Sequence, residues 1–64
     1  MNVNAYKNEL LERLIEYINE CGIPLNQLSK LSGINRATFY RIKERDYVPS
    51  LEVLVKYMEA LNIL

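Results

Sequence analysis

The residues with the most evident chemistry are basic, and they are concentrated in one part of a chain whose formal net charge is zero. Residues 1–27 carry a net charge of −2, residues 28–46 carry +3 and residues 47–64 carry −1. The middle segment holds five of the eight lysines and arginines, namely Lys30, Arg36, Arg41, Lys43 and Arg45. Guanidinium and ammonium groups donate hydrogen bonds and attract anions, so a local basic face can create a useful field on a neutral protein. The simpler alternative is that these basic residues only form a solvated surface. The arrangement of their side chains must decide between this alternative and an anion-binding face.

Catalytic and metal chemistry are not indicated. Cys21 is the only cysteine and histidine is absent, so one chain cannot build a disulfide or a cysteine–histidine metal site. The sequence also lacks a glycine-rich phosphate loop and a nucleophile–base pair. The carboxylates Glu9, Glu12, Glu16 and Glu20 have the spacing of a solvated helix face. We therefore expect no enzyme and no cofactor, with Cys21 filling space near a helix end.

Hydrophobic spacing predicts helices that would position the basic residues. The first starts between Asn4 and Asn8 and ends at Gly22, and its apolar stripe is Leu10, Leu11, Leu14, Ile15 and Ile18. Pro24 can open a second helix but not continue one, because it lacks the backbone N–H. The apolar residues of that short helix are Leu25, Leu28 and Leu31, and Gly33 ends it.

Two further helices complete the expected fold. Asn35 is a good N-cap for a third helix with Phe39 and Ile42 turned inward. Ser50 would cap a fourth, whose stripe is Leu51, Leu54, Val55, Met58 and Leu61. With no segment typical of a strand, residues 1–64 are expected to form one compact all-α, four-helix domain. No apolar run could span a bilayer or serve as a signal peptide, so we expect a cytoplasmic protein.

Only Gly33-Ile34-Asn35 separates the second and third helices. A glycine at this joint allows a sharp turn while Ile34 fills the angle, which is the design of a helix-turn-helix. With Phe39 and Ile42 inside, the pairs Arg36/Tyr40 and Ala37/Arg41 point outward. This face suits a DNA major groove, where arginine pairs with guanine and alanine packs on a thymine methyl group.

Over residues 10–63 the sequence resembles the phage repressor/Cro-like helix-turn-helix family, a lambda-repressor-like fold. The residues that carry the resemblance are Gly22-Ile23, Leu28, Gly33, Ile34, Asn35, Thr38, Phe39, Ile42 and the segment "PSLEVLVKYMEAL". The resemblance implies that the third helix enters the major groove of operator DNA. The implied base-contacting residues are Arg36, Ala37, Tyr40 and Arg41. The implied backbone-contacting residues are Asn35, Thr38, Lys43, Arg45 and Tyr47, although Tyr47 could equally pack locally.

The chain departs from the family pattern at several positions. Leu25 stands where a glutamine often contacts phosphate, and Arg45 replaces a common glycine. Lys43 and Ile18 stand where a glutamate and its arginine partner are common, so both halves of that ion pair are missing together. The chain also stops at Leu64, where many members add a fifth helix used in dimer contact.

Two functional hypotheses follow from the sequence. The first is a phage or bacterial transcription regulator, such as a repressor, that binds a near-palindromic DNA operator. The second is a protein-binding adaptor or antitoxin-like module with the same fold, which the neutral charge and five tyrosines favour. Lysine and arginine clustered on one side argue against the second, because protein interface cores are depleted of lysine.

The last predicted helix has a second apolar stripe, made of Val53, Tyr57, Ala60 and Leu64. It lies too far round the helix for one core to cover both stripes easily. We expect it to form the interface of a homodimer. The alternative is that Val3 and Tyr6 fold back and cover it within one chain.

Overall fold

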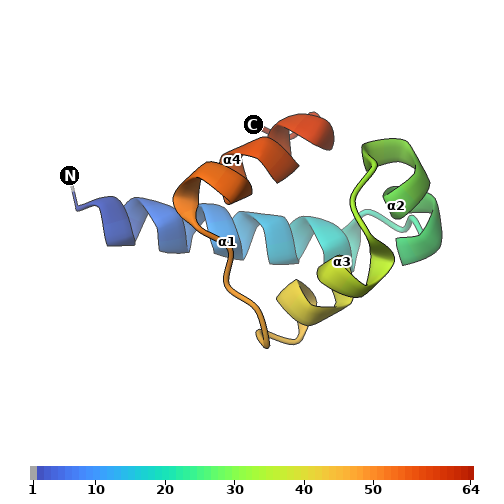
Figure 1. The fold of residues 1–64 in the computed structure, drawn as a ribbon, viewed down its shortest axis with the longest axis horizontal. Coiled ribbons are helices and arrows are strands. Elements are labelled where there is room, and N and C mark those ends of the chain that lie inside the picture. The colour runs from blue at the N-terminus through green and yellow to red at the C-terminus, as the bar shows by residue number, and fades with distance from the viewer. Residues whose placement is uncertain (1) are drawn as a thin grey trace.

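The computed structural model describes residues 2–64. This part of the chain contains four helices and no strand. They are α1 (Val3–Glu20), α2 (Leu25–Ser32), α3 (Arg36–Lys43) and α4 (Leu51–Ala60). In Figure 1, α4 lies along one side of α1, α3 lies on the other side, and α2 is at the C-terminal end of α1. The all-α, four-helix prediction is confirmed.

Side chains at the N-terminal ends satisfy the free backbone N–H groups of the helices. The Asn35 side chain accepts a hydrogen bond from the backbone of Ala37 at 2.8 Å, and the Ser50 hydroxyl accepts one from the backbone of Val53 at 3.3 Å. Both predicted caps are therefore in place. The start of α1 was predicted too late, because Asn2 caps it by accepting from the backbone of Asn4 at 2.9 Å. Any asparagine in that polar segment could have served as the cap.

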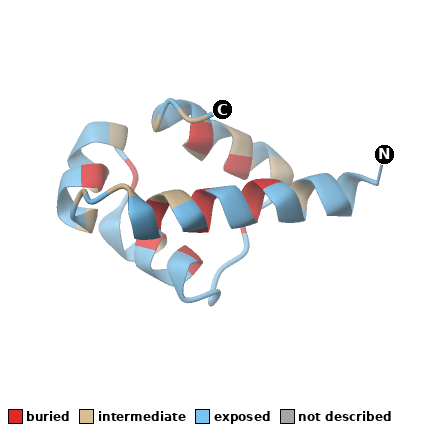
Figure 2. Cartoon of the chain, turned by 180° about the vertical axis from the view of Figure 1, so that it is seen from behind, coloured by how far each residue is buried: buried red, intermediate tan, exposed pale blue. Residues whose placement is uncertain are grey.

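The core is built on α1. Figure 2 shows buried positions recurring along this helix, while its first turns are exposed and extend past the other three helices. Phe39 and Ile42 from α3 and Leu54 from α4 are 0% exposed. The buried hydrophobic core among residues 2–64 is Leu10, Leu11, Leu14, Ile15, Ile18, Leu28, Ile34, Phe39, Ile42, Leu54 and Met58, and the Pro49 side chain is buried as well.

One predicted core residue of α2 lies at the surface. Leu28 is 1% exposed, whereas Leu31 is 68% exposed. Three residues advance a helix by about 300°, so Leu25 and Leu31 lie about 120° apart, on opposite sides of Leu28. Leu25 lies against the core and Leu31 is turned out of it. Half-buried Ser32 lies on the inner side of the last turn instead.

None of the helices in the described part of the chain combines the length and apolar character needed to cross a bilayer. Residues 2–64 likewise contain no group of three or more histidine, cysteine, aspartate or glutamate side chains placed to hold a metal ion.

Candidate nucleic-acid interface

The joint between α2 and α3 is held by local hydrogen bonds and one buried side chain. Gly33 adopts a left-handed conformation (φ 77°), and its N–H donates to the Ser29 carbonyl at 2.8 Å. The Ser32 hydroxyl donates to the Leu28 carbonyl at 2.7 Å and accepts from the backbone N–H of Ile34 at 3.2 Å. Ile34 is 8% exposed between the helices. These contacts set the angle at which α2 presents α3.

Sequence reasoning missed the part played by Ser32. A serine at the end of a helix can bond back to the carbonyl four residues earlier, and this spacing to Leu28 was visible in the sequence. Its second bond, to the N–H beyond Gly33, depends on the turn geometry that only the structure supplies.

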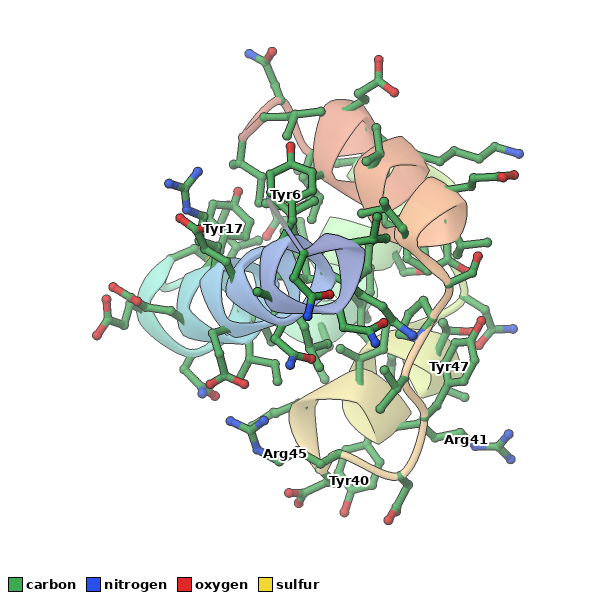
Figure 3. All side chains as sticks on the ribbon, turned by 90° about the vertical axis from the view of Figure 1, so that its left-hand side faces the viewer. Tyr6, Tyr17, Tyr40, Arg41, Arg45 and Tyr47 are labelled. Carbon is green, nitrogen blue, oxygen red and sulfur yellow. The ribbon has the colours of Figure 1, made fainter. Side chains whose placement is uncertain are left out.

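The outer face of α3 carries all four predicted base-contacting residues. Arg36, Ala37, Tyr40 and Arg41 are exposed, and Tyr40 has 53% of its surface accessible. Tyr40 and Arg41 point away from α1 in Figure 3. The helix is thus two-sided, and its inner residues fix which side chains can reach a ligand.

Glu44 belongs to the same outer face and was overlooked. It follows Ala37 by seven residues, which is about two helical turns, and it is exposed. Its carboxylate places negative charge at the C-terminal end of the face. Arg36 is in the first turn of α3 and Arg41 is in the last, so Glu44 offsets part of the positive charge only at the C-terminal end of the face.

The predicted backbone-contacting residues occupy different environments. Asn35 is exposed with its side-chain oxygen engaged as the cap, and Thr38 is half-buried. Lys43 is exposed near the end of α3 and makes no ion pair among residues 2–64. Lys43 therefore keeps its charge available to a ligand.

Arg45 is engaged within the chain. Its guanidinium donates to both carboxylate oxygens of Glu12 on α1, at 2.6 and 2.7 Å. These hydrogen bonds lower the pKa of Glu12 from its ordinary value of 4.5 and raise the pKa of Arg45. Both side chains are more than half exposed, so water screens the attraction. The family's ion pair between α1 and the end of α3 is absent here, and Glu12–Arg45 links nearby parts of the fold.

The backbone of Arg45 explains why a glycine suits this position. Arg45 has φ 63°, in the left-handed region. Its N–H donates to the Ile42 carbonyl at 3.0 Å, and the N–H of Asp46 donates to the Arg41 carbonyl at 2.8 Å. This is the Schellman arrangement that ends a helix, and glycine adopts it at the lowest cost.

Tyr47 lies near Tyr57 of α4. Burial raises the pKa of the Tyr57 hydroxyl, and the neighbouring Tyr47 raises it further. Tyr47 is 38% exposed, on the segment between α3 and α4. Tyr47 therefore lies beside Tyr57 and keeps part of its surface open.

The predicted dimer stripe is covered only in part. Tyr57 packs against the core of its own chain, and Val53 is half-buried. Ala60 is exposed in the last turn of α4. Leu64 is 58% exposed, but the prediction that it lies on the helix is wrong, because α4 ends at Ala60 and Asn62 adopts a left-handed conformation (φ 59°). Val3 is itself 63% exposed at the start of α1, so it does not provide the cover that the alternative required. Tyr6 is 36% exposed and points to the side of α1 on which α4 lies (Figure 3).

A shallow hollow lies between the two helices of the joint. Leu25 of α2 and Arg36, Ala37 and Tyr40 of α3 line it, and its volume is about 300 Å³. Three of the four lining residues thus belong to the outer face of α3.

A short α2, a tight glycine turn and an α3 with a buried inner face and a basic outer face define a helix-turn-helix DNA-binding fold. The chain matches the family of Cro/C1-type helix-turn-helix DNA-binding domains over residues 13–63, and it belongs to that family. The resemblance deduced from the sequence is thereby confirmed. Curated proteins and solved structures gave no match.

Proposed function

We propose that the protein is a transcription regulator that recognises operator DNA by inserting α3 into the major groove. Membership of a DNA-binding family supports the class of ligand. The observation that carries the proposal further is the exposed row of Arg36, Ala37, Tyr40 and Arg41 opposite the buried Phe39 and Ile42. Arginine can pair bidentately with guanine, whereas alanine and the tyrosine ring contact apolar base edges.

In this proposal the phosphate backbone is contacted at the two ends of α3. Asn35 and Thr38 lie at its N-terminal end, and Lys43 lies at its C-terminal end. Arg45 and Tyr47 follow on the next segment, where Arg45 must exchange Glu12 for a phosphate in order to contribute. Such an exchange is inexpensive because an exposed ion pair contributes little to stability.

The regulator is proposed to act as a homodimer on a near-palindromic operator, as a repressor without catalytic activity. A two-fold dimer places two copies of α3 about 34 Å apart, one helical turn of DNA. The proposal implies a cytoplasmic location, because the operators of bacteria and their phages are there.

Selection of bound sequences from random duplex DNA tests the proposal. We expect one enriched motif with two inverted half-sites, and affinity for it on the order of 10³-fold or more above that for random DNA of equal length. Binding without enrichment would reduce the function to non-specific DNA contact. The absence of binding even at low salt would favour the alternative, a protein-binding module, for which exposed Tyr40 beside the hollow is a suitable contact.

A further inference from the structure

The residues from α2 and α3 that line the hollow are already ordered in the protein without a ligand. Leu25 is half-buried and packs against the core from the first turn of α2. The backbone N–H of Ala37 donates a hydrogen bond to the side-chain oxygen of Asn35, so the first turn of α3 is also ordered. A wall that is already ordered costs little conformational entropy when it meets a ligand.

The lining of the hollow is apolar except at Arg36. A leucine side chain, an alanine methyl group and a tyrosine ring offer no hydrogen-bonding group apart from the tyrosine hydroxyl. A polar group placed against Leu25 and Ala37 would lose its water without gaining a partner, which is unfavourable. The hollow therefore selects an apolar group next to a group that can accept a hydrogen bond from Arg36.

The DNA major groove offers one apolar group of this kind. The C5-methyl group of thymine projects into the groove, whereas the other groups that the base edges present there are hydrogen-bond donors and acceptors. The hollow is continuous with the outer face of α3, and Arg36 and Arg41 there complement the charge of DNA.

We propose that the hollow is a thymine-reading subsite and that Leu25 is a specificity-determining residue. The inference rests on the proposed operator binding. The family pattern has a phosphate-contacting glutamine at this position, and a leucine cannot make that contact. Leu25 instead forms the α2 wall against which the methyl group packs, opposite Ala37 and Tyr40, while Arg36 is free to hydrogen-bond an adjacent base.

Replacement of each thymine of the selected operator by deoxyuridine, one position at a time, tests the subsite. This change removes one methyl group and keeps base pairing and the other groups of the base edge. With the parent protein we expect one thymine in each half-site at which the replacement lowers affinity about fourfold, the effect of burying one methyl-sized group. The same scan with Leu25→Ala and Leu25→Gln should lose most of that penalty.

Leu31→Ala is the matched control. Leu31 is on the same helix, is 68% exposed and does not line the hollow, so this variant should keep the parent's penalty. Leu25→Gln keeps a side chain of comparable volume but places a polar amide at its end, and circular dichroism shows whether each variant is folded.

The results separate the subsite from the proposed function. A selected operator that tolerates deoxyuridine at every thymine, or a penalty unchanged in folded Leu25→Gln, would overturn the thymine subsite while operator binding stands. A selection that yields no operator would reject both, and the hollow would then be examined as a contact for an apolar side chain of a protein partner.

Discussion

At the scale of single residues, α3 separates the side chains available for binding from those that maintain the fold. Arg36 and Arg41 are exposed, and no ion pair within residues 2–64 involves either of them. Arg45 lies just beyond the same helix but is held by Glu12. Arginines close together in the sequence are therefore expected to contribute differently to DNA affinity.

Arg36→Ala and Arg41→Ala should each weaken binding to the selected operator by about 1–3 kcal/mol, because each removes a base contact. Thermal unfolding should be unchanged, since neither side chain is buried. The measurement is a titration of operator and of random duplex DNA with each variant and with the double variant. Arg13→Ala/Lys56→Ala removes the same charge from α1 and α4 and should have a much smaller effect. Equal operator affinity of the double arginine variant and the parent would reject the assignment.

The Glu12–Arg45 pair should give the fold a pH dependence. Because the pKa of Glu12 is lowered in the folded state, its contribution is complete above the ordinary value of 4.5 and is lost as the pH falls through the lower folded-state pKa. Thermal unfolding of the parent and of Glu12→Gln should therefore differ at neutral pH and converge as the pH falls through the lowered pKa of Glu12.

Two variants control this experiment. Glu16→Gln is on the same helix, and Glu16 makes no ion pair within the described residues, so the variant should behave as the parent does. In an Arg45→Gly background, Glu12→Gln should have no effect at either pH, because the guanidinium is gone. A persisting difference there would show that the pair is not the cause.

At the scale of elements, the orientation of α3 depends on what its inner face buries. Phe39 and Ile42 are 0% exposed, and Leu28 and Ile34 are buried with them. The turn at Gly33 and the Ser32 hydroxyl hold α2 and α3 at a fixed angle, so the outer face of α3 is presented as a rigid unit. Rotation of α3 by one residue would turn a different set of side chains outward.

Phe39→Ala should unfold the protein or nearly so, because truncating a buried aromatic residue costs about 3–5 kcal/mol in a small domain of marginal stability. Tyr40→Ala, at the next position, removes a side chain that is 53% exposed and should leave thermal unfolding nearly unchanged. Circular dichroism melts of the two variants make the comparison. Equal destabilisation by both would mean that the inner and outer faces of α3 are assigned incorrectly.

At the scale of the whole molecule, the surface near the C-terminal end of α4 remains partly apolar. Tyr57 packs against the core of its own chain, but Ala60 and Leu64 are exposed. Ala60 and half-buried Val53 are the part of the stripe on α4 that a second copy could still cover, and Leu64 follows beyond the end of the helix. The dimer proposal therefore now depends on the exposed end of the stripe rather than on Tyr57.

Ala60→Glu should convert the proposed homodimer to monomer and weaken operator binding, because it places a charge in the interface without disturbing the core. Glu59→Lys, at an exposed position of the same helix about 100° round from Ala60, is the control and should remain dimeric. Light scattering over a range of concentrations measures the association state. A parent protein that stays monomeric at high concentration, both free and on DNA, would exclude the dimer.

The sequence by itself determined the helical segments and the two faces of α3. Periodic leucines and isoleucines, the caps Asn35 and Ser50, and the breaks at Gly22, Pro24 and Gly33 act over a few residues, so local chemistry was enough to predict them. The same periodicity turned Phe39 and Ile42 inward, which left the outer face of α3 to be deduced by elimination.

Only the tertiary structure decided what lies opposite each exposed side chain. The partner of Arg45 is 33 residues away in the chain, and Tyr47 of the segment between α3 and α4 lies beside Tyr57 of α4. From the sequence, Leu31 was predicted to be a core residue like Leu25 and Leu28. In the structure only one side of α2 faces the core, and Leu31 lies on the other side. The hollow that Leu25 shares with α3 exists because two helices meet at the angle set by Gly33 and Ile34. Contacts between distant segments depend on the angle between the helices, and a pattern of neighbouring residues does not predict that angle.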